Sequence, residues 1–224
     1  MSTLAWPSGY ELREWAEIDS TNEEARRIAA AGEKGPVWLR ADRQTAGRGR
    51  RGRAWESPTG NLAATLLIAP SKPASECAQL SFVTAIAAAD TASVFASGAD
   101  IKVKWPNDVL ANGRKLAGIL LESASGADSV LSFLAIGVGM NLAHFPPDTE
   151  FPATSLAALG ASAPSPSAAL VQLATIGEIT IACALGYLDF RYANEPWRPG
   201  HPKLDAWYAK VVKLPPLAET MPVG

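Results

Sequence analysis

Cysteine and histidine are scarce in this sequence. It contains two of each among 224 residues, and Cys77 and Cys183 stand far apart, with no C-x-x-C or Cys/His ligand spacing around them. Disulfide frameworks and zinc sites use characteristic spacings, so neither is indicated, and a reducing cytoplasm is the expected location. His144 and His201 have no evident nucleophile beside them, which argues against a catalytic triad.

An excess of charge is also missing. The formal net charge is -2, which argues against a surface built as a whole to neutralise nucleic-acid phosphates, so any anion site must be local. Residues 1–10 lack the basic start and apolar core of a secretory signal. Residues 168–188 are nearly uncharged over a length that could span a bilayer, but they have no basic flank, and we expect a buried helix there. The polar residues that interrupt this stretch are Gln172, Thr175, Glu178 and Thr180.

The hydrophobic pattern predicts helices and strands in mixed order. Ser20 and Glu23 form a capping box that should open a helix ending near Gly32. The dipeptide Asn112-Gly113 predicts a two-residue hairpin turn. Strands are expected at 14–18, 35–41, 61–68, 101–105, 109–111, 114–122 and 130–138, and an alanine-rich helix at 74–97. This order indicates an α+β fold with a mixed, largely antiparallel sheet packed on helices.

Residues 43–53 hold five arginines and three glycines. Glycines expose backbone N–H groups and guanidinium groups pair with phosphate or carboxylate oxygens, so the segment predicts an anion site, although such a run seen alone is more often a flexible basic loop. Gly47, Gly49 and Gly52 also spell G-x-G-x-x-G, but the chain then turns towards another strand, which disfavours a dinucleotide-binding or kinase fold. We interpret the segment as a lid that becomes ordered over a nucleotide-bearing intermediate.

Two lysine motifs follow the arginine-rich segment. Residues 104–108, Lys-Trp-Pro-Asn-Asp, place a cation, an amide and a carboxylate at a strand end, as a phosphate and Mg²⁺ would require. Seen alone, such a motif is more often an ordinary turn at a strand end. Lys115 lies on the outgoing arm of the hairpin, where alternation would place it on the face of Ala117, while Gly118 permits close approach to the backbone. A lysine in such a place is commonly only an exposed edge residue.

Five motifs in one order resemble the catalytic domain of biotin protein ligases over residues 10–145. They are Asp19-Ser20-Thr21-Asn22, Gln44-Thr45-Ala46-Gly47-Arg48-Gly49-Arg50-Arg51-Gly52-Arg53-x-Trp55, Lys104-Trp105-Pro106-Asn107-Asp108, Arg114-Lys115-Leu116-Ala117-Gly118-Ile119 and Gly137-x-Gly139-x-Asn141. The resemblance implies a fold related to class II aminoacyl-tRNA synthetases and lipoate ligases. It also implies an enzyme that adenylates biotin with ATP to biotinyl-5'-AMP and transfers biotin to a lysine of a biotin carboxyl carrier protein.

The resemblance also implies roles for individual residues. Lys115, Arg50 and Arg48 would be catalytic. The biotin site would contain Ser20, Thr21, Asn22, Gln44, Arg48, Gly49, Arg50, Lys115 and Gly118. The ATP and adenylate site would contain Arg51, Trp55, Lys104, Asn107, Asp108, Gly137, Gly139 and Asn141, with Mg²⁺ on Asp108. Because the substrate carboxylate is itself the nucleophile, adenylation needs cations and N–H donors at the phosphate and no triad.

The end of the chain departs from the family. Biotin protein ligases generally close with a small β-barrel, whereas residues 191–224 are rich in proline and show few alternating strand patterns. We therefore predict a catalytic domain at 1–190 and a divergent or truncated segment at 191–224, which Trp197 and Trp207 could pack onto the body. Ten to fourteen residues precede the first strand, so the chain resembles the monofunctional class without a DNA-binding domain. We expect neither DNA nor a membrane as a partner, and a homodimer is left open.

Two rival functions are considered. A lipoate ligase or an octanoyl transferase would share the fold, but the transferase would need a reactive cysteine, and the apolar neighbours of Cys77 predict a packed thiol. An RNA-binding module could use the arginines, but no aromatic residues are interleaved with them.

Overall fold

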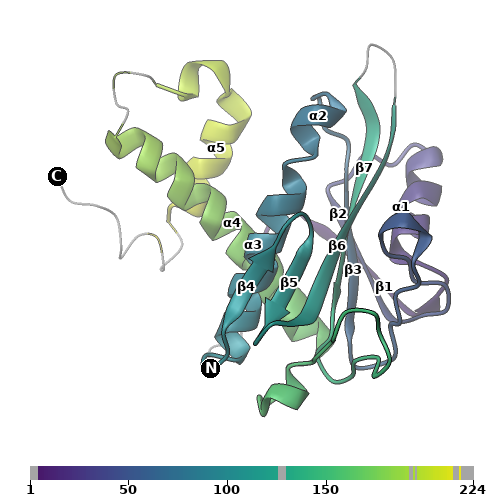
Figure 1. Cartoon of the computed structure of the whole chain (residues 1–224). Coiled ribbons are helices and arrows are strands. Elements are labelled where there is room, and N and C mark those ends of the chain that lie inside the picture. Colours follow the sequence, from purple (N-terminus) through teal and green to yellow (C-terminus); the bar gives the residue numbers. More distant parts are fainter. Residues whose placement is uncertain (1–4, 126–129, 192–193, 195, 214–216, 218–224) are drawn as a thin grey trace. The chain divides into compact units, whose positions relative to one another are not determined.

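The structure is a computed structural model that describes residues 5–125, 130–191, 194, 196–213 and 217 (Figure 1). Only the backbone is described for six residues of the last long helix: Thr180, Cys183, Ala184, Tyr187, Phe190 and Arg191. The chain divides into two compact units, residues 1–173 and 174–224, which are described separately. The two units meet at residues 173 and 174, earlier than the predicted boundary between a catalytic domain (1–190) and a C-terminal segment (191–224). The assignment of separate roles to these two parts stays a prediction.

The first unit contains a seven-stranded sheet with the strand order β1-β2-β3-β7-β6-β5-β4. β1 and β2 are parallel and the other pairs are antiparallel, so the predicted mixed, largely antiparallel sheet is confirmed. The strands are β1 (Glu11–Ile18), β2 (Val37–Gln44), β3 (Leu62–Ile68), β4 (Ile101–Lys104), β5 (Asp108–Ala111), β6 (Arg114–Ser125) and β7 (Leu131–Met140). The helices of this unit are α1 (Thr21–Ala30), α2 (Ala74–Cys77), α3 (Leu80–Phe95) and the start of α4 (Pro166–Arg191), with short 3-10 turns at Arg50–Gly52 and Ala157–Leu159.

Alternation along the strands divides the core between the two faces of the sheet. On one face, Ala25 of α1 packs with Leu67 of β3 and with Phe133 and Ala135 of β7. On the opposite face, Leu134 and Ile136 of β7 pack against Cys77 of α2 and Leu80 of α3. α1 and α3 therefore cover opposite faces of the sheet (Figure 1). Since Gly137 and Gly139 continue the alternation of Phe133 and Ala135, they lie on the α1 face.

Two local predictions are tested directly. At the hairpin turn Asn112 has φ 50° and Gly113 has φ 76°, and Ala111 pairs with Arg114, which confirms the two-residue turn. At the start of α1 the Ser20 hydroxyl accepts a hydrogen bond from the Glu23 N–H at 3.4 Å. The reciprocal half of the capping box is replaced, because the Ser20 N–H donates to Asp19 at 2.7 Å and Glu23 pairs with Arg26 and Arg48.

Among the described residues, one helical stretch, Ala74–Phe95, is long and apolar enough by length and composition to cross a membrane. The core helix of a globular protein passes the same test. α3 contacts β4, β5, β6 and β7, and its Ala85, Ala88 and Ala92 are fully buried. One face of this stretch is therefore part of the core, whereas Phe82, Ile86 and Val94 are exposed.

The second unit is helical in its described part. It contains the end of α4, a 3-10 turn at Arg198–Gly200, and α5 (Pro202–Val211). Ala182 and Leu185 of α4 form a cluster with Tyr208 and Val211 of α5, against which Trp197 and Trp207 pack. The two tryptophans therefore contribute to a core within this unit, and the described residues of the segment that we predicted to lack a complete barrel contain no strand.

Candidate functional site

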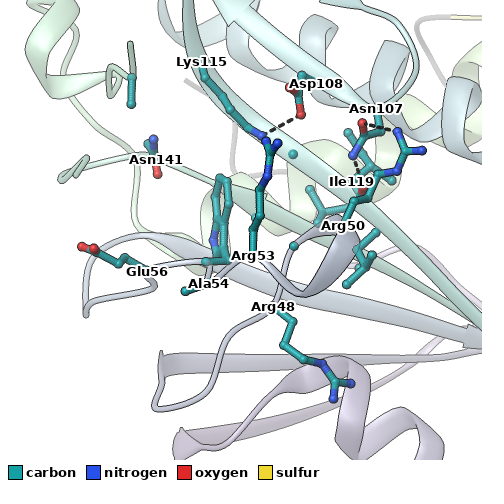
Figure 2. Close-up of a pocket in the computed structure, with 18 of the residues that line it drawn as sticks. Arg48, Arg50, Arg53, Ala54, Glu56, Asn107, Asp108, Lys115, Ile119 and Asn141 are labelled. Carbon is teal, nitrogen blue, oxygen red and sulfur yellow. Dashed lines mark hydrogen bonds and ion pairs between the residues drawn. The ribbon is translucent and has the colours of Figure 1, made fainter. Parts of the chain in front are cut away.

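A cavity of about 570 Å³ lies in the first unit, on the α1 face of the sheet (Figure 2). All of the site residues predicted from the sequence line it except Lys104. The Lys104 ammonium lies 3.6 Å from the ring centroid of Phe151, and Phe151 is itself a lining residue. Segments far apart in the sequence thus converge on one hollow, and Lys104 stands behind its wall.

One side of the cavity is the hydroxyl–amide wall, which we define as Ser20, Thr21, Asn22 and Gln44. The side-chain oxygen of Gln44 accepts hydrogen bonds from the Thr21 N–H at 2.8 Å and the Thr21 hydroxyl at 3.1 Å. The fully buried Thr65 of β3 supports both residues of α1: its hydroxyl lies 2.8 Å from that of Thr21 and donates to Oδ1 of Asn22 at 2.7 Å. These side chains are therefore held in place by the protein alone.

The carboxylate of Glu122 fixes Asn22 from the other end. Asn22 Nδ2 donates to Glu122 at 2.8 Å and lies 3.3 Å from the carbonyl oxygen of Leu120. Because both of these groups only accept hydrogen bonds, the amide nitrogen must face them and Oδ1 must face Thr65. The wall thus has a defined pattern of donors and acceptors.

Lys115 reaches the cavity through a β-bulge. The register of β5 and β6 shifts between Val109 and Leu110, so that Val109 pairs with Ala117 and Leu110 with Lys115. A bulge inserts an extra residue and re-aims the side chains that follow it. The prediction that simple alternation places Lys115 on the face of Ala117 is therefore wrong: its Cε is 3.4 Å from where a Cβ on Gly118 would stand, and Gly118 lines the cavity.

Polar pairs surround Lys115 and Arg50. Lys115 Nζ lies 2.7 Å from Oδ1 of Asp108, and Arg50 donates to the side-chain oxygen of Asn107 at 3.1 Å (Figure 2). Asn107 is in turn held by its own amide, which donates to the carbonyl oxygen of Ile119 at 2.7 Å. Asp108 at the start of β5 and Asn107 just before it thus position the two cations at the cavity.

The arginine loop, defined as residues 47–53, folds back on itself. Gly49 N–H donates to Arg53 O at 2.7 Å, and Trp55 N–H donates to Gly47 O at 3.0 Å. Arg48 points away from Lys115 and Arg50 (Figure 2) and pairs with Glu23 at 3.1 Å and Glu122 at 3.3 Å. The loop leads into no helix beyond a single 3-10 turn, in line with the predicted failure of the dinucleotide fingerprint. A change from disorder to order in this loop stays a prediction.

The charged groups behind the hydroxyl–amide wall are ion-paired. Hydrogen bonds from Arg27 lower the pKa of Asp19 to about 2. Hydrogen bonds from Arg26, and secondarily from Arg48, lower the pKa of Glu23. Both carboxylates are therefore ionised at neutral pH and offset the arginines around the cavity.

The glycines of β7 are required by close contacts. A Cβ on Gly137 would stand 2.3 Å from the side-chain oxygen of Asn22, and one on Gly139 would stand 2.4 Å from the indole ring of Trp55. Neither position has space for a side chain. Asn141 follows on the same strand end: its amide nitrogen donates to Thr154 O at 3.0 Å, and its Oδ1 is buried with no hydrogen-bond partner among the described residues. Asn141 thus offers an acceptor to a ligand.

Several lining or supporting residues were not predicted. Thr65 and Glu122 lie outside the five motifs, and so does the segment 146–153, of which Phe151 and Glu150 line the cavity. This segment is held against the start of β6, because Lys115 N–H donates to Pro152 O and Thr154 N–H donates to Lys115 O. No periodicity marks it; its only sequence signal is its position directly after the last motif.

Cys77 is not a candidate nucleophile. It lies in the cluster on the opposite face of the sheet, 4% exposed, and desolvation raises the pKa of its thiol. The predicted packed thiol is confirmed. His144 and His201 are both exposed, as predicted for surface residues.

Comparison with known families gives two matches. The model described as "Biotin/lipoate A/B protein ligase family" matches residues 16–141, which carry all five motifs. The model described as "Glutathione S-transferase, C-terminal domain" matches residues 173–210, most of which belong to the second unit.

Similar proteins of known name are biotin ligases. The biotin–[acetyl-CoA-carboxylase] ligase of Paracoccus denitrificans is 50% identical over 132 residues, 58% of this chain and 54% of that protein. The corresponding ligase of Mycobacterium tuberculosis is 35% identical over 86% of this chain and 67% of that protein. The chain spans about half the length of several curated relatives that it matches.

Solved structures agree with the fold. The biotin protein ligase from Aquifex aeolicus in complex with biotin and ATP superposes with a TM-score of 0.64 and 27% identity, over 76% of this chain and 70% of that one. Such ligases have the catalytic fold of class II aminoacyl-tRNA synthetases, so the predicted fold class is confirmed.

Proposed function

Because the chain belongs to the biotin/lipoate A/B protein ligase family, we propose that it activates biotin with ATP to biotinyl-5'-AMP and transfers biotin to a lysine of a carrier protein. The observation that carries the proposal is the cavity, in which the hydroxyl–amide wall faces the same hollow as Lys115, Arg50 and Arg51. A neutral ring with donors and acceptors suits the wall. A carboxylate and a phosphate suit the cations.

The reaction uses these groups in two steps. In the first, an oxygen of the biotin carboxylate attacks the α-phosphorus of ATP and the bond to the β-phosphate breaks, releasing pyrophosphate. Lys115 neutralises the carboxylate and the α-phosphate as they approach, and Arg50 stabilises the developing charge. In the second, the amine of the acceptor lysine attacks the acyl carbon and AMP leaves. The arginine loop excludes water from the acyl-adenylate between the steps.

The residues at the phosphate side fit a Mg²⁺ ion only in part. Among the described residues, no group of three or more His, Cys, Asp or Glu side chains could hold a metal. Mg²⁺ is commonly held by one or two carboxylates together with substrate phosphates and water, and Asp108 can supply one such carboxylate. Since Asp108 pairs with Lys115, Lys115 would have to turn towards the substrate for Asp108 to bind the ion. Mg²⁺ would neutralise the phosphate charge of ATP.

The partners are proposed on similar grounds. The relatives from Paracoccus denitrificans and Mycobacterium tuberculosis are named for acetyl-CoA carboxylase, so we expect a biotin carboxyl carrier protein as acceptor. We expect no DNA or membrane partner, because the arginines gather at the cavity and the most apolar helix packs on the sheet. We also propose a cytoplasmic location. The oligomeric state is left open between a monomer and a homodimer.

The test is a substrate comparison with the whole chain. The protein is incubated with ATP and Mg²⁺ and with biotin, lipoate or octanoate, and pyrophosphate release is measured. We expect release with biotin at a rate at least about tenfold above that with the other acids, since a site built to hydrogen-bond a ring discriminates against substrates without it. Faster release with lipoate would assign the chain to the lipoate branch of the family, and no release with any acid would contradict adenylation.

A further inference from the structure

Glu122 joins the hydroxyl–amide wall to the arginine loop. It lies near the end of β6 on the cavity side of the sheet, since Gly118, Leu120 and Glu122 share one face by alternation. One of its oxygens accepts the amide of Asn22 at 2.8 Å, and both lie 3.3–3.4 Å from Nη2 of Arg48. Its carboxylate is thus shared by a wall residue and a loop residue that are far apart in the sequence.

The two partners of Glu122 have no equivalent replacement for it. Asn22 is buried, and its amide nitrogen has the Leu120 carbonyl as a second acceptor, but at 3.3 Å against 2.8 Å for Glu122. Arg48 has Glu23 as a second carboxylate, but Glu23 is also bound to Arg26. The Glu122 carboxylate is therefore the nearer acceptor for the Asn22 amide and one of the two anions that hold Arg48.

We propose that Glu122 is a positioning residue for biotin, acting through Asn22 and Arg48 and not by contact with the reacting atoms. This inference rests on the proposed function. It predicts that loss of the Glu122 charge weakens biotin binding and frees Arg48, whereas ATP binding, to which neither Asn22 nor Arg48 is assigned, is retained.

The variant Glu122→Gln keeps the shape and removes the charge. We expect the KM for biotin to rise about tenfold, the loss of one charge-assisted hydrogen bond, with the KM for ATP within about twofold of the parent value. Glu122→Asp, which keeps the charge on a shorter stem, should recover part of the biotin affinity. Glu24→Gln removes a charge of the same sign from α1, where Glu24 pairs with Arg27, and serves as the matched control with unchanged KM values.

Limited trypsin digestion gives a second readout that needs no activity. Cleavage within residues 48–53 should be several-fold faster in Glu122→Gln than in the parent and in Glu24→Gln, because Arg48 has lost an anchor, while the melting temperatures stay similar. If an active parent and Glu122→Gln share the same biotin KM, the inference is overturned and the proposed function stands. If the parent releases no pyrophosphate with biotin, the proposed function fails. In that case equal trypsin cleavage rates in Glu122→Gln and the parent would also overturn the inference that Glu122 anchors Arg48.

Discussion

The hydroxyl–amide wall and the arginine loop face the same cavity but are built differently. Thr21, Asn22 and their support Thr65 are at most 6% exposed, and their polar atoms are bonded within the protein. Arg48 has 42% of its side chain exposed, and Arg53 has 70%. The wall is already in place for a ligand, whereas the loop holds cations that partly face solvent.

This difference follows from the cost of burial. Neutral amides and hydroxyls can be buried at little cost once each has a partner, so recognition of a ring can be preorganised. Several buried cations without anions would be far more costly. Exposed arginines avoid that cost until an anionic ligand arrives, and the contrast predicts different consequences for mutations on the two sides.

The largest effect is expected at Lys115, the cation that β6 brings to the cavity. Lys115→Ala should reduce biotin-dependent pyrophosphate release by at least about 100-fold, because it removes the cation at the reacting carboxylate and phosphate. Lys102→Ala, which removes an exposed lysine of β4 paired with Asp100, is the matched control. Equal rates for Lys115→Ala and the parent would refute the assignment.

The wall should respond in stability as well as in binding. Thr65→Val leaves Oδ1 of the buried Asn22 without its donor, and we expect a loss of about 1–3 kcal/mol in the free energy of unfolding, measured by urea denaturation. Thr91→Val is the control: Thr91 is equally buried, but its hydroxyl donates to Ala87 O of its own helix. A smaller loss for Thr65→Val than for Thr91→Val would contradict the preorganised wall.

The loop should respond in retention of the intermediate and hardly in stability. Arg50→Gly removes the hydrogen bond to Asn107, and we expect biotinyl-5'-AMP to dissociate about tenfold faster, as for one exposed charge-assisted contact. A filter assay with labelled adenylate measures this rate. Arg43→Gly, at a position that does not line the cavity and pairs with Glu17, should retain the adenylate as the parent does. Unchanged retention in Arg50→Gly would show that the loop does not close on the intermediate.

The residues of the five motifs could be predicted because each motif is local: a cap, a strand end or a glycine-rich turn carries its chemistry within a few positions. Thr65 could not be found this way. It enters the site because β3 pairs with β7, so that Thr65 lies opposite Gly137, and a single buried threonine in an apolar strand gives no sign of that partner. Glu122 was missed because its partner Asn22 is distant in the sequence, and the sequence around Glu122 does not indicate that contact.

The face of Lys115 was mispredicted because alternation assumes an unbroken strand. The bulge beside Val109 breaks it, and nothing in the sequence of β5 or β6 marks the bulge.

The prolines of the second unit had a different meaning from the one expected. We took them as evidence against a complete barrel, but Pro202 begins α5. A proline in the first turn of a helix loses no hydrogen bond, because that N–H has no partner in the helix.

The smallest effect is expected behind the wall, at Asp19, whose carboxylate bonds to Arg27 and to the Ser20 N–H. Its folded pKa of about 2 lies below the ordinary value of 3.8, so its contribution to stability is present above about pH 4 and is lost as the pH falls towards 2. Since the side chain is 42% exposed, Asp19→Asn should lower the melting temperature at pH 7 by only roughly 1–3 °C. The acid limb of a stability profile between pH 4 and 2 should flatten in this variant, with Asp90→Asn as the control for net charge. An unchanged acid limb would mean that the Arg27 pair contributes nothing in solution and that the hydroxyl–amide wall depends on its buried hydrogen bonds alone.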